Sequence, residues 1–132
     1  MVYKLFFNMY ENHIPSESDK HILHLNKFDE RIQEALVYIE NHLEYGSPIE
    51  EVAAYVSLSP SHFSKLFKKI TGSSYTDYLT DVRIQHAQIL LATTTLTIHE
   101  IASKIGVSGG NYLCTIFKKN LNISPSEYKK LL

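Results

Sequence analysis

The chain contains one pattern twice, about fifty residues apart. Residues 49–72 and residues 98–122 each predict a short helix, a turn and a second helix, which together form a helix-turn-helix. The copies match at an offset of 49 in their first halves and, after one inserted residue, at an offset of 50. The matched pairs are Ala53 with Ala102, Val56 with Ile105, Ser59 with Ser108, Phe63 with Leu113, and Phe67-Lys68-Lys69 with Phe117-Lys118-Lys119. Such a duplication indicates two helices that read neighbouring stretches of one DNA groove.

Capping signals predict where several helices begin. A Ser or Thr hydroxyl followed three residues later by Glu satisfies backbone N–H groups of the first turn, and proline suits the first helical position. The segments between these signals lack the alternation of apolar and polar residues that is typical of strands. The sequence therefore predicts an all-α fold of about seven helices. The signals are Ser47-Pro48 with Glu50, Ser59-Pro60, Thr97 with Glu100, and Ser124-Pro125 with Glu127.

The order of these helices predicts two helix-turn-helix subdomains joined by a long linker helix. We place the first subdomain at residues 28–74, the linker helix at 75–93 and the second subdomain at 94–132. A helix of about eighteen residues is roughly 27 Å long, and neighbouring major-groove segments on one face of DNA lie about 34–36 Å apart. Residues 1–27 are interpreted as an N-terminal extension, a linker or the remnant of a preceding domain.

The charge is distributed unevenly along the chain. The formal net charge is −1, but residues 1–51 hold four Lys/Arg and ten Asp/Glu, a balance of −6. Residues 52–132 hold nine Lys/Arg and four acids, a balance of +5. Because phosphate binding requires only a local basic face, this distribution is compatible with a nucleic-acid partner. The single cysteine, Cys114, excludes an internal disulfide, and no apolar run approaches 18 residues, so we expect a cytoplasmic protein without a membrane span.

The second helix of each copy has a buried stripe and an outward face. Apolar residues recur at i, i+3, i+4 and i+7, which predicts burial of one side of each helix. They are Phe63, Leu66, Phe67 and Ile70, then Leu113, Ile116, Phe117 and Leu121. The outward residues of the first turns are the candidate base contacts: Ser61, Ser64 and Lys65, then Gly110, Asn111, Tyr112 and Thr115. The lysines late in each helix are the candidate phosphate contacts: Lys68, Lys69, Lys118 and Lys119.

These side chains differ in the base edges that suit them. Lys65 suits guanine O6 and N7 or a phosphate, Asn111 suits adenine, and Thr115 suits a thymine methyl group. Tyr112 equally fits the role of a half-exposed packing residue. The lysine pairs equally fit pairing with the helix C-termini. Since the base-reading part of the second helix contains no lysine or arginine, that helix is also compatible with a role as mainly a phosphate anchor.

From Phe28 to Leu132 the sequence resembles the DNA-binding domain of the AraC/XylS family of bacterial transcription regulators. The resemblance implies binding of one monomer to double-stranded promoter DNA through both units, often as an activator, and contact with RNA polymerase. It also implies a sensor or dimerisation domain, which residues 1–27 are too short to form, so the chain is either a small stand-alone regulator or a fragment. The motifs that carry the resemblance are Arg83-Ile-x-x-Ala87-x-x-Leu90-Leu91, Ile101-Ala102-x-x-Ile105-Gly106, Phe117-Lys118-Lys119 and Ser124-Pro125-Ser126-Glu127-Tyr128.

The chain departs from the usual pattern of this family at four positions of its second copy. Val107 and Leu113 stand where aromatic residues are usual, and Asn122 replaces a glycine. Thr115 stands where members often carry arginine. Packing should survive these changes, whereas base reading by the second copy is less secure.

Other functional classes have weaker support from the sequence. A protein-interaction module built on the same helix-turn-helix scaffold is the main alternative. An enzyme is not expected, because the chain lacks a Gly-rich phosphate loop, a paired-carboxylate site and a Ser/His/Asp arrangement. His21 and His24 have the spacing of a metal-binding pair, but nothing completes a four-ligand set, so neither a metal nor another cofactor is expected. Cys114 flanks an apolar stripe and is interpreted as a packed residue or a passive helix residue rather than a nucleophile.

Overall fold

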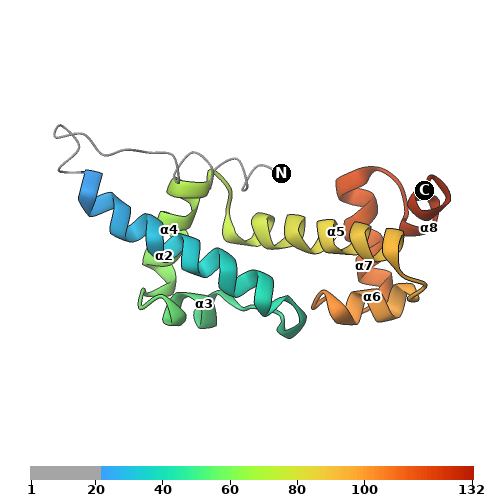
Figure 1. Ribbon diagram of the computed structural model, residues 1–132, viewed down its shortest axis with the longest axis horizontal. Helices are drawn as coiled ribbons and strands as arrows, with labels where there is room; N and C mark the ends of the chain where they lie inside the picture. The colour runs from blue at the N-terminus through green and yellow to red at the C-terminus, as the bar shows by residue number, and fades with distance from the viewer. Residues whose placement is uncertain (1–21) are drawn as a thin grey trace. The chain divides into compact units, whose positions relative to one another are not determined.

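The computed structural model describes the backbone of residues 22–132 and the side chains from Glu30 onward. This part of the chain holds seven α-helices, one short 3-10 helix and no strand (Figure 1), which confirms the all-α prediction. The elements are α2 (Ile22–Asn41), η2 (Leu43–Tyr45), α3 (Ile49–Tyr55), α4 (Pro60–Thr71), α5 (Tyr75–Thr93), α6 (Ile98–Lys104), α7 (Gly110–Leu121) and α8 (Pro125–Lys130).

The helices form two compact units, each with its own core. The first unit combines α2 as far as Tyr38 with residues 49–75, which contain α3 and α4. The second unit combines residues 39–48, which contain the end of α2 and η2, with residues 76–132. The subdomain limits inferred from the sequence repeat stay a prediction.

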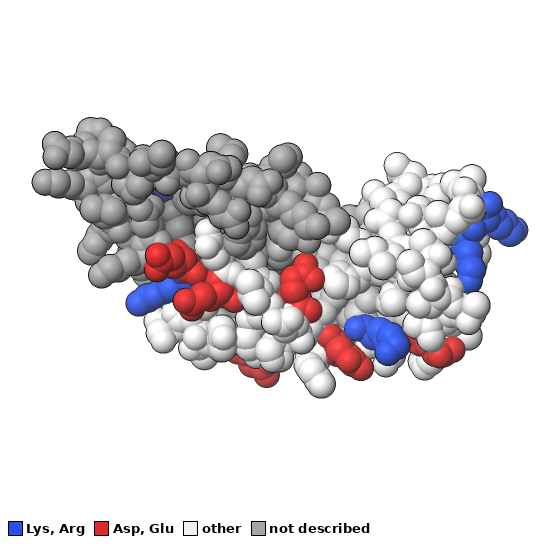
Figure 2. All heavy atoms as spheres, in the orientation of Figure 1, with Lys and Arg blue, Asp and Glu red and all other residues white. Residues whose placement is uncertain are grey.

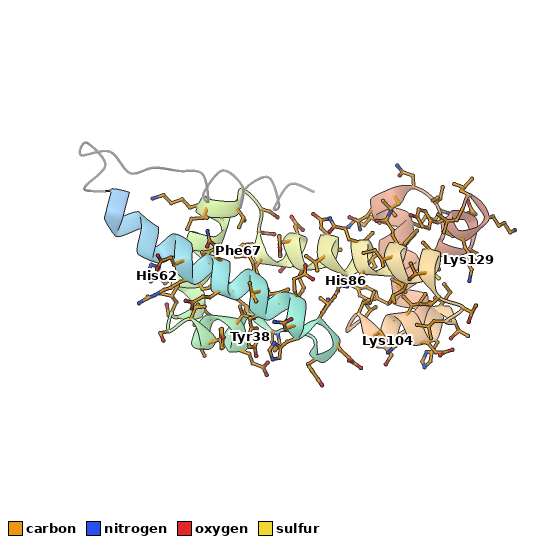
Figure 3. The ribbon with its side chains drawn as sticks, viewed as in Figure 1. Tyr38, His62, Phe67, His86, Lys104 and Lys129 are labelled. Atoms are coloured by element: carbon orange, nitrogen blue, oxygen red, sulfur yellow. The ribbon has the colours of Figure 1, made fainter. Side chains whose placement is uncertain are left out.

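The core of the first unit is built from one apolar stripe on each of its helices. Ile32, Ala35 and Leu36 of α2 and Val52 and Ala53 of α3 are buried. They pack with an aromatic cluster in which the ring centroids of Phe63, Phe67 and Tyr75 lie 5.6 to 5.7 Å apart. Edge contacts between aromatic rings add to the burial of apolar area, so this cluster holds α4 firmly in the unit. Figure 3 labels Phe67 on α4.

The core of the second unit is formed by buried side chains of α5, α6 and α7. Its buried side chains include Val82, Ala87, Ile101, Leu113 and Phe117, and the Tyr128 ring of α8 meets the Phe117 ring edge-on at 5.6 Å.

Two polar contacts attach the end of α2 and η2 to α5 in the second unit. Nη2 of Arg83 donates a hydrogen bond of 3.0 Å to the Gly46 carbonyl. Nε2 of His86 and Oε2 of Glu40 are 2.7 Å apart. Figure 3 labels His86 on α5.

Most helix starts follow the predicted caps. The Ser59 hydroxyl accepts from the His62 N–H at 3.1 Å, and the Ser124 hydroxyl accepts from the Glu127 N–H at 3.1 Å. Thr97 and Glu100 form the complete capping box. At α3 the prediction was one residue early: the helix begins at Ile49, so Pro48 precedes it rather than filling its first position.

Candidate nucleic-acid interface

The two copies of the repeat fold into helices of equal length. The first helices, α3 and α6, have seven residues each, and the second helices, α4 and α7, have twelve. The first helices match at an offset of 49 and the second helices at an offset of 50. The inserted residue therefore lies in the turn between α6 and α7. The helix-capping position of Ser59 is taken by Gly109, and the predicted match of Ser59 with Ser108 is therefore wrong at the level of the structure.

Each turn reverses at a residue in the left-handed backbone conformation. Ser57 has a φ of 61° and Gly106 a φ of 78°, at equivalent positions of the two copies. The following residue closes both turns in the same way: Leu58 N–H donates to the Ala53 carbonyl and Val107 N–H to the Ala102 carbonyl, each at 2.9 Å.

The ends of α4 and α7 are also equivalent. Gly72 and Asn122 adopt left-handed C-caps, and their N–H groups donate to the carbonyls of Lys68 and Lys118 at 2.9 and 2.8 Å. These residue types accept that conformation most readily, as the sequence indicated. The second helices of the two units therefore have equal lengths and equivalent C-caps, whereas their N-caps, Ser59 and Gly109, differ.

Burial orients the two helices in their units. Phe63, Leu66, Phe67, Leu113, Ile116 and Phe117 are buried as predicted. Ile70 and Leu121, which were expected to complete the buried stripes, are only half-buried. Both lie at the C-terminal ends of their helices, next to the exposed C-caps Gly72 and Asn122.

On α4, all the candidate contact residues lie on the exposed side. Ser61, Ser64 and Lys65 are exposed within the first two turns, while Lys68 and Lys69 are exposed near the end. The ammonium groups of these three lysines form no ion pair or hydrogen bond with another residue of the described part of the chain. Their ammonium groups are therefore available to an anionic partner. His62, labelled in Figure 3, is exposed beside Ser61 in the first turn.

On α7, three of the four candidate base contacts are exposed. Asn111, Thr115 and Tyr112 face solvent, and Tyr112 has 53% of its surface exposed, which fits both a contact residue and a half-exposed packing residue. Gly110 does not face outward as expected. It is half-buried, and a Cβ atom there would lie 3.4 Å from Cγ2 of Ile98, because the start of α7 packs on the start of α6.

Hydrogen bonds distinguish the polar side chains of α7. The Thr115 hydroxyl donates to the Asn111 carbonyl at 3.1 Å. Nδ2 of Asn120 donates to the Ile116 carbonyl at 2.7 Å, so that amide is engaged by its own helix. The amide of Asn111 has no hydrogen-bond partner in the part of the chain that the structure describes.

The second unit exposes lysines in addition to the two on α7. Lys118 and Lys119 are exposed at the end of α7, and Lys104 of α6, Lys129 and Lys130 are exposed as well. Figure 2 shows basic side chains over α6 and α8, with acidic side chains beside those over α6, and further acidic side chains over α2 of the first unit. Figure 3 labels Lys104 and Lys129 at these places. Only the lysines of the two second helices were predicted from the sequence, and the repeat gives no signal for Lys104, because Tyr55 holds its position in the first copy.

The other sites considered from the sequence have little structural support. Cys114 is half-exposed rather than fully packed, at the α7 position that corresponds to Ser64 of α4. His21 and the side chain of His24 lie outside the described residues, and no group of three or more potential metal ligands occurs within them. An open cavity of about 330 Å³ in the first unit is lined by Glu30, Arg31, Glu34, Tyr55, Val56 and Ser57. None of the described helices is both long and apolar enough for a membrane crossing.

Comparison with known proteins identifies the family. A family model described as a helix-turn-helix domain matches residues 52–131. The regulatory protein PocR of Salmonella typhimurium is 33% identical over 120 residues, which are 91% of this chain and 40% of PocR. The arabinose operon regulatory protein of Escherichia coli is 38% identical over 102 residues, which are 76% of this chain and 35% of that protein. The chain thus spans about two fifths or less of the length of these relatives.

Solved structures agree with the sequence relatives. The C-terminal domain of AraT, a response regulator from Geobacillus stearothermophilus, has a TM-score of 0.74 and 34% identity, covering 77% of this chain and 85% of that one. The DNA-binding domain of the transcriptional factor AdpA, solved with a target DNA, has a TM-score of 0.73 and 28% identity, covering 76% and 91%. The chain therefore belongs to the AraC/XylS family of transcription regulators and contains the DNA-binding tandem helix-turn-helix domain of that family.

Proposed function

We propose that this chain binds promoter DNA sequence-specifically through both of its helix-turn-helix units, with α4 and α7 each entering a major-groove segment. The observation that carries the proposal is the match of these two helices in length and C-cap, each with an exposed polar first half and an exposed lysine pair near its end. An α-helix fits the major groove, and the first turns of a recognition helix meet the base edges.

In the first unit, α4 would combine base reading with phosphate binding. Ser61 and Ser64 present hydroxyl groups that can donate or accept, and Lys65 presents an ammonium group suited to guanine O6 and N7. Lys68 and Lys69 would hold phosphates and so set the register of the helix on the duplex.

In the second unit, α7 would approach DNA with a different set of groups. Asn111, Tyr112 and Thr115 would face the bases, and Lys118 and Lys119 would hold phosphates. Gly110 stays a candidate base contact, and because it packs on the start of α6 we also assign it the role of positioning α7. The close packing of the two helix starts supports this role.

The wider role follows from the relatives. The relatives include an arabinose operon regulatory protein and, in Staphylococcus xylosus, a lactose operon transcription activator. We infer that this chain acts in the cytoplasm as a regulator, most simply an activator that contacts RNA polymerase. The chain spans a minor part of the length of those relatives. We therefore propose that this DNA-binding domain works together with a sensor or dimerisation domain.

Selection of duplex fragments from a random library, followed by titration of the best fragment at several salt concentrations, tests the proposal. DNA binding predicts a saturable complex whose log affinity falls linearly with log salt, with a slope of about −0.9 for each phosphate neutralised. A protein-interaction module on the same scaffold would enrich no fragment and form no saturable complex, and that result would reject the proposal.

A further inference from the structure

The same position of the two recognition helices carries different chemistry. Lys65 is the sixth residue of α4, and Thr115 is the sixth residue of α7. Both side chains are exposed. If the helices are used alike, the two residues meet equivalent places in their groove segments. An ammonium group suits the two acceptors of guanine, whereas a methyl group suits the C5-methyl of thymine.

The hydrogen bond of Thr115 decides which part of its side chain is available. Its hydroxyl proton is donated to the Asn111 carbonyl four residues earlier, at 3.1 Å. This is the usual internal bond of a helical threonine. A hydroxyl held in this way cannot donate to the O6 or N7 of guanine. Its oxygen can then only accept from a base, and the γ-methyl group is the part of Thr115 left for an apolar contact with a base.

Asn111 supplies the complementary group one turn earlier on the same helix. Its side chain is exposed, and its amide has no partner within the described residues. An asparagine amide offers one donor and one acceptor, which match N7 and N6 of adenine. The other asparagine of α7, Asn120, lies near the end of the helix rather than in its first turns, and its Nδ2 donates to the Ile116 carbonyl.

We propose that α7 is a reader of A·T pairs, in which the Thr115 methyl group contacts a thymine methyl and the Asn111 amide contacts adenine. The target DNA would then be asymmetric in composition, with a G·C pair opposite Lys65 and A·T pairs beneath α7. The second unit thus contributes specificity in addition to phosphate anchoring. This inference rests on the proposed DNA binding and names the class of sequence that the second unit selects.

Replacing thymine by deoxyuridine, which lacks the C5-methyl group, tests the methyl contact directly. On the selected duplex, one uracil substitution beneath α7 should weaken binding of the unaltered chain about fourfold, the value of one buried methyl group. Thr115→Val keeps the γ-methyl and should retain this sensitivity. Thr115→Ser removes the methyl and should bind the thymine and uracil duplexes equally. Thr93→Ser is the matched control, because Thr93 bonds to its own helix in the same way and should leave the sensitivity unchanged.

A gain of specificity provides a second test. Thr115→Lys gives α7 the ammonium group that Lys65 supplies at the same position of α4. Library selection with this variant should enrich a G·C pair at the position where the unaltered chain selects thymine. Thermal unfolding of each variant checks that the fold is kept, which the exposed position of Thr115 favours.

Several results would overturn the inference while leaving the proposed function intact. One is a selected duplex in which no uracil substitution changes the affinity. Another is a Thr115→Ser variant that keeps the preference of the unaltered chain while Thr115→Val loses it, which would make the hydroxyl the reader. Enrichment of G·C pairs beneath α7 would also overturn the inference. Failure of the unaltered chain to bind any duplex would instead overturn the proposed function, and this inference with it.

Discussion

At the scale of single residues, the two turns have the same backbone conformation but different tolerance for side chains. Ser57 accepts a φ of 61° in the first unit. Gly106 has a φ of 78° at the equivalent position, and a Cβ atom there would lie 2.1 Å from the Leu43 carbonyl oxygen of η2. In the second unit glycine is therefore required both by the left-handed conformation and by the close approach of η2.

Gly106→Ala should lower the free energy of unfolding by about 2–4 kcal/mol, because the strain of the left-handed conformation adds to a backbone clash. Gly46→Ala is the matched control in the same unit: its φ is 88° but nothing lies within 4 Å of the added Cβ atom. It should cost only about 1 kcal/mol. Chemical denaturation of both variants measures the difference. Equal losses would show that the contact with η2 does not constrain Gly106.

Lysines at different helix positions should affect DNA binding differently. Lys65→Ala should lower affinity for the selected duplex by about 1–3 kcal/mol and relax the preference at one base position. Lys118→Ala should weaken all sequences alike and reduce the magnitude of the salt slope by about 1. Parallel titrations of selected and scrambled duplexes measure both effects. If both variants lost affinity equally on every sequence, Lys65 would not be a base-reading residue.

At the scale of helices, the contact between Glu40 and His86 attaches the last turn of α2 to α5 within the second unit. The hydrogen bond from His86 to Glu40 raises the pKa of His86, partial burial lowers it, and the negative charge of Glu40 raises it further. The net pKa is above the ordinary value of His86. The protonated imidazole is therefore favoured in the folded chain.

This contact should make stability depend on pH in a defined direction. Because the pKa of His86 is higher in the folded chain, the stabilisation is fully present below the unfolded pKa of about 6.5 and is lost as the pH rises through the folded pKa. His86→Gln should therefore reduce the melting temperature more at pH 5.5 than at pH 8. The effect should be small, within about 1 kcal/mol, because both groups are partly exposed. A difference in melting temperature that is the same at both pH values would contradict this account.

The helices and their caps could largely be predicted from the sequence, whereas finer features of the site could not. The hydroxyl cap of Ser59, the capping box at Thr97 and the left-handed cap at Asn122 follow from local chemistry, so local patterns identified them. Ser108 matches Ser59 at an offset of 49 in the sequence, but Gly109 holds the N-cap position of α7. The burial of Gly110 depends on how α7 meets α6, which periodicity does not report. The bond from Thr115 to Asn111 depends on a side-chain rotamer, which no sequence pattern indicates.

At the scale of the whole molecule, the chain combines two folded units with an uneven charge. Its net charge is only −1, yet the part from residue 52 onward has a balance of +5. Phosphate binding requires exposed cations without acidic partners, and the lysines of α4 and α7 meet that condition within the described residues. The total charge of a chain is thus a weaker guide to nucleic-acid binding than the positions of its unpaired cations.

Site-directed DNA cleavage tests most directly whether both recognition helices bind one duplex. In a Cys114→Ser background, a single cysteine at Lys69 or at Lys119 would carry a DNA-cleaving chelate at matched positions of α4 and α7. The account predicts two clusters of cuts on the selected duplex, with centres about 10 base pairs apart, one from each probe. Cuts by both probes at the same place, or by only one of them on fully bound DNA, would contradict it.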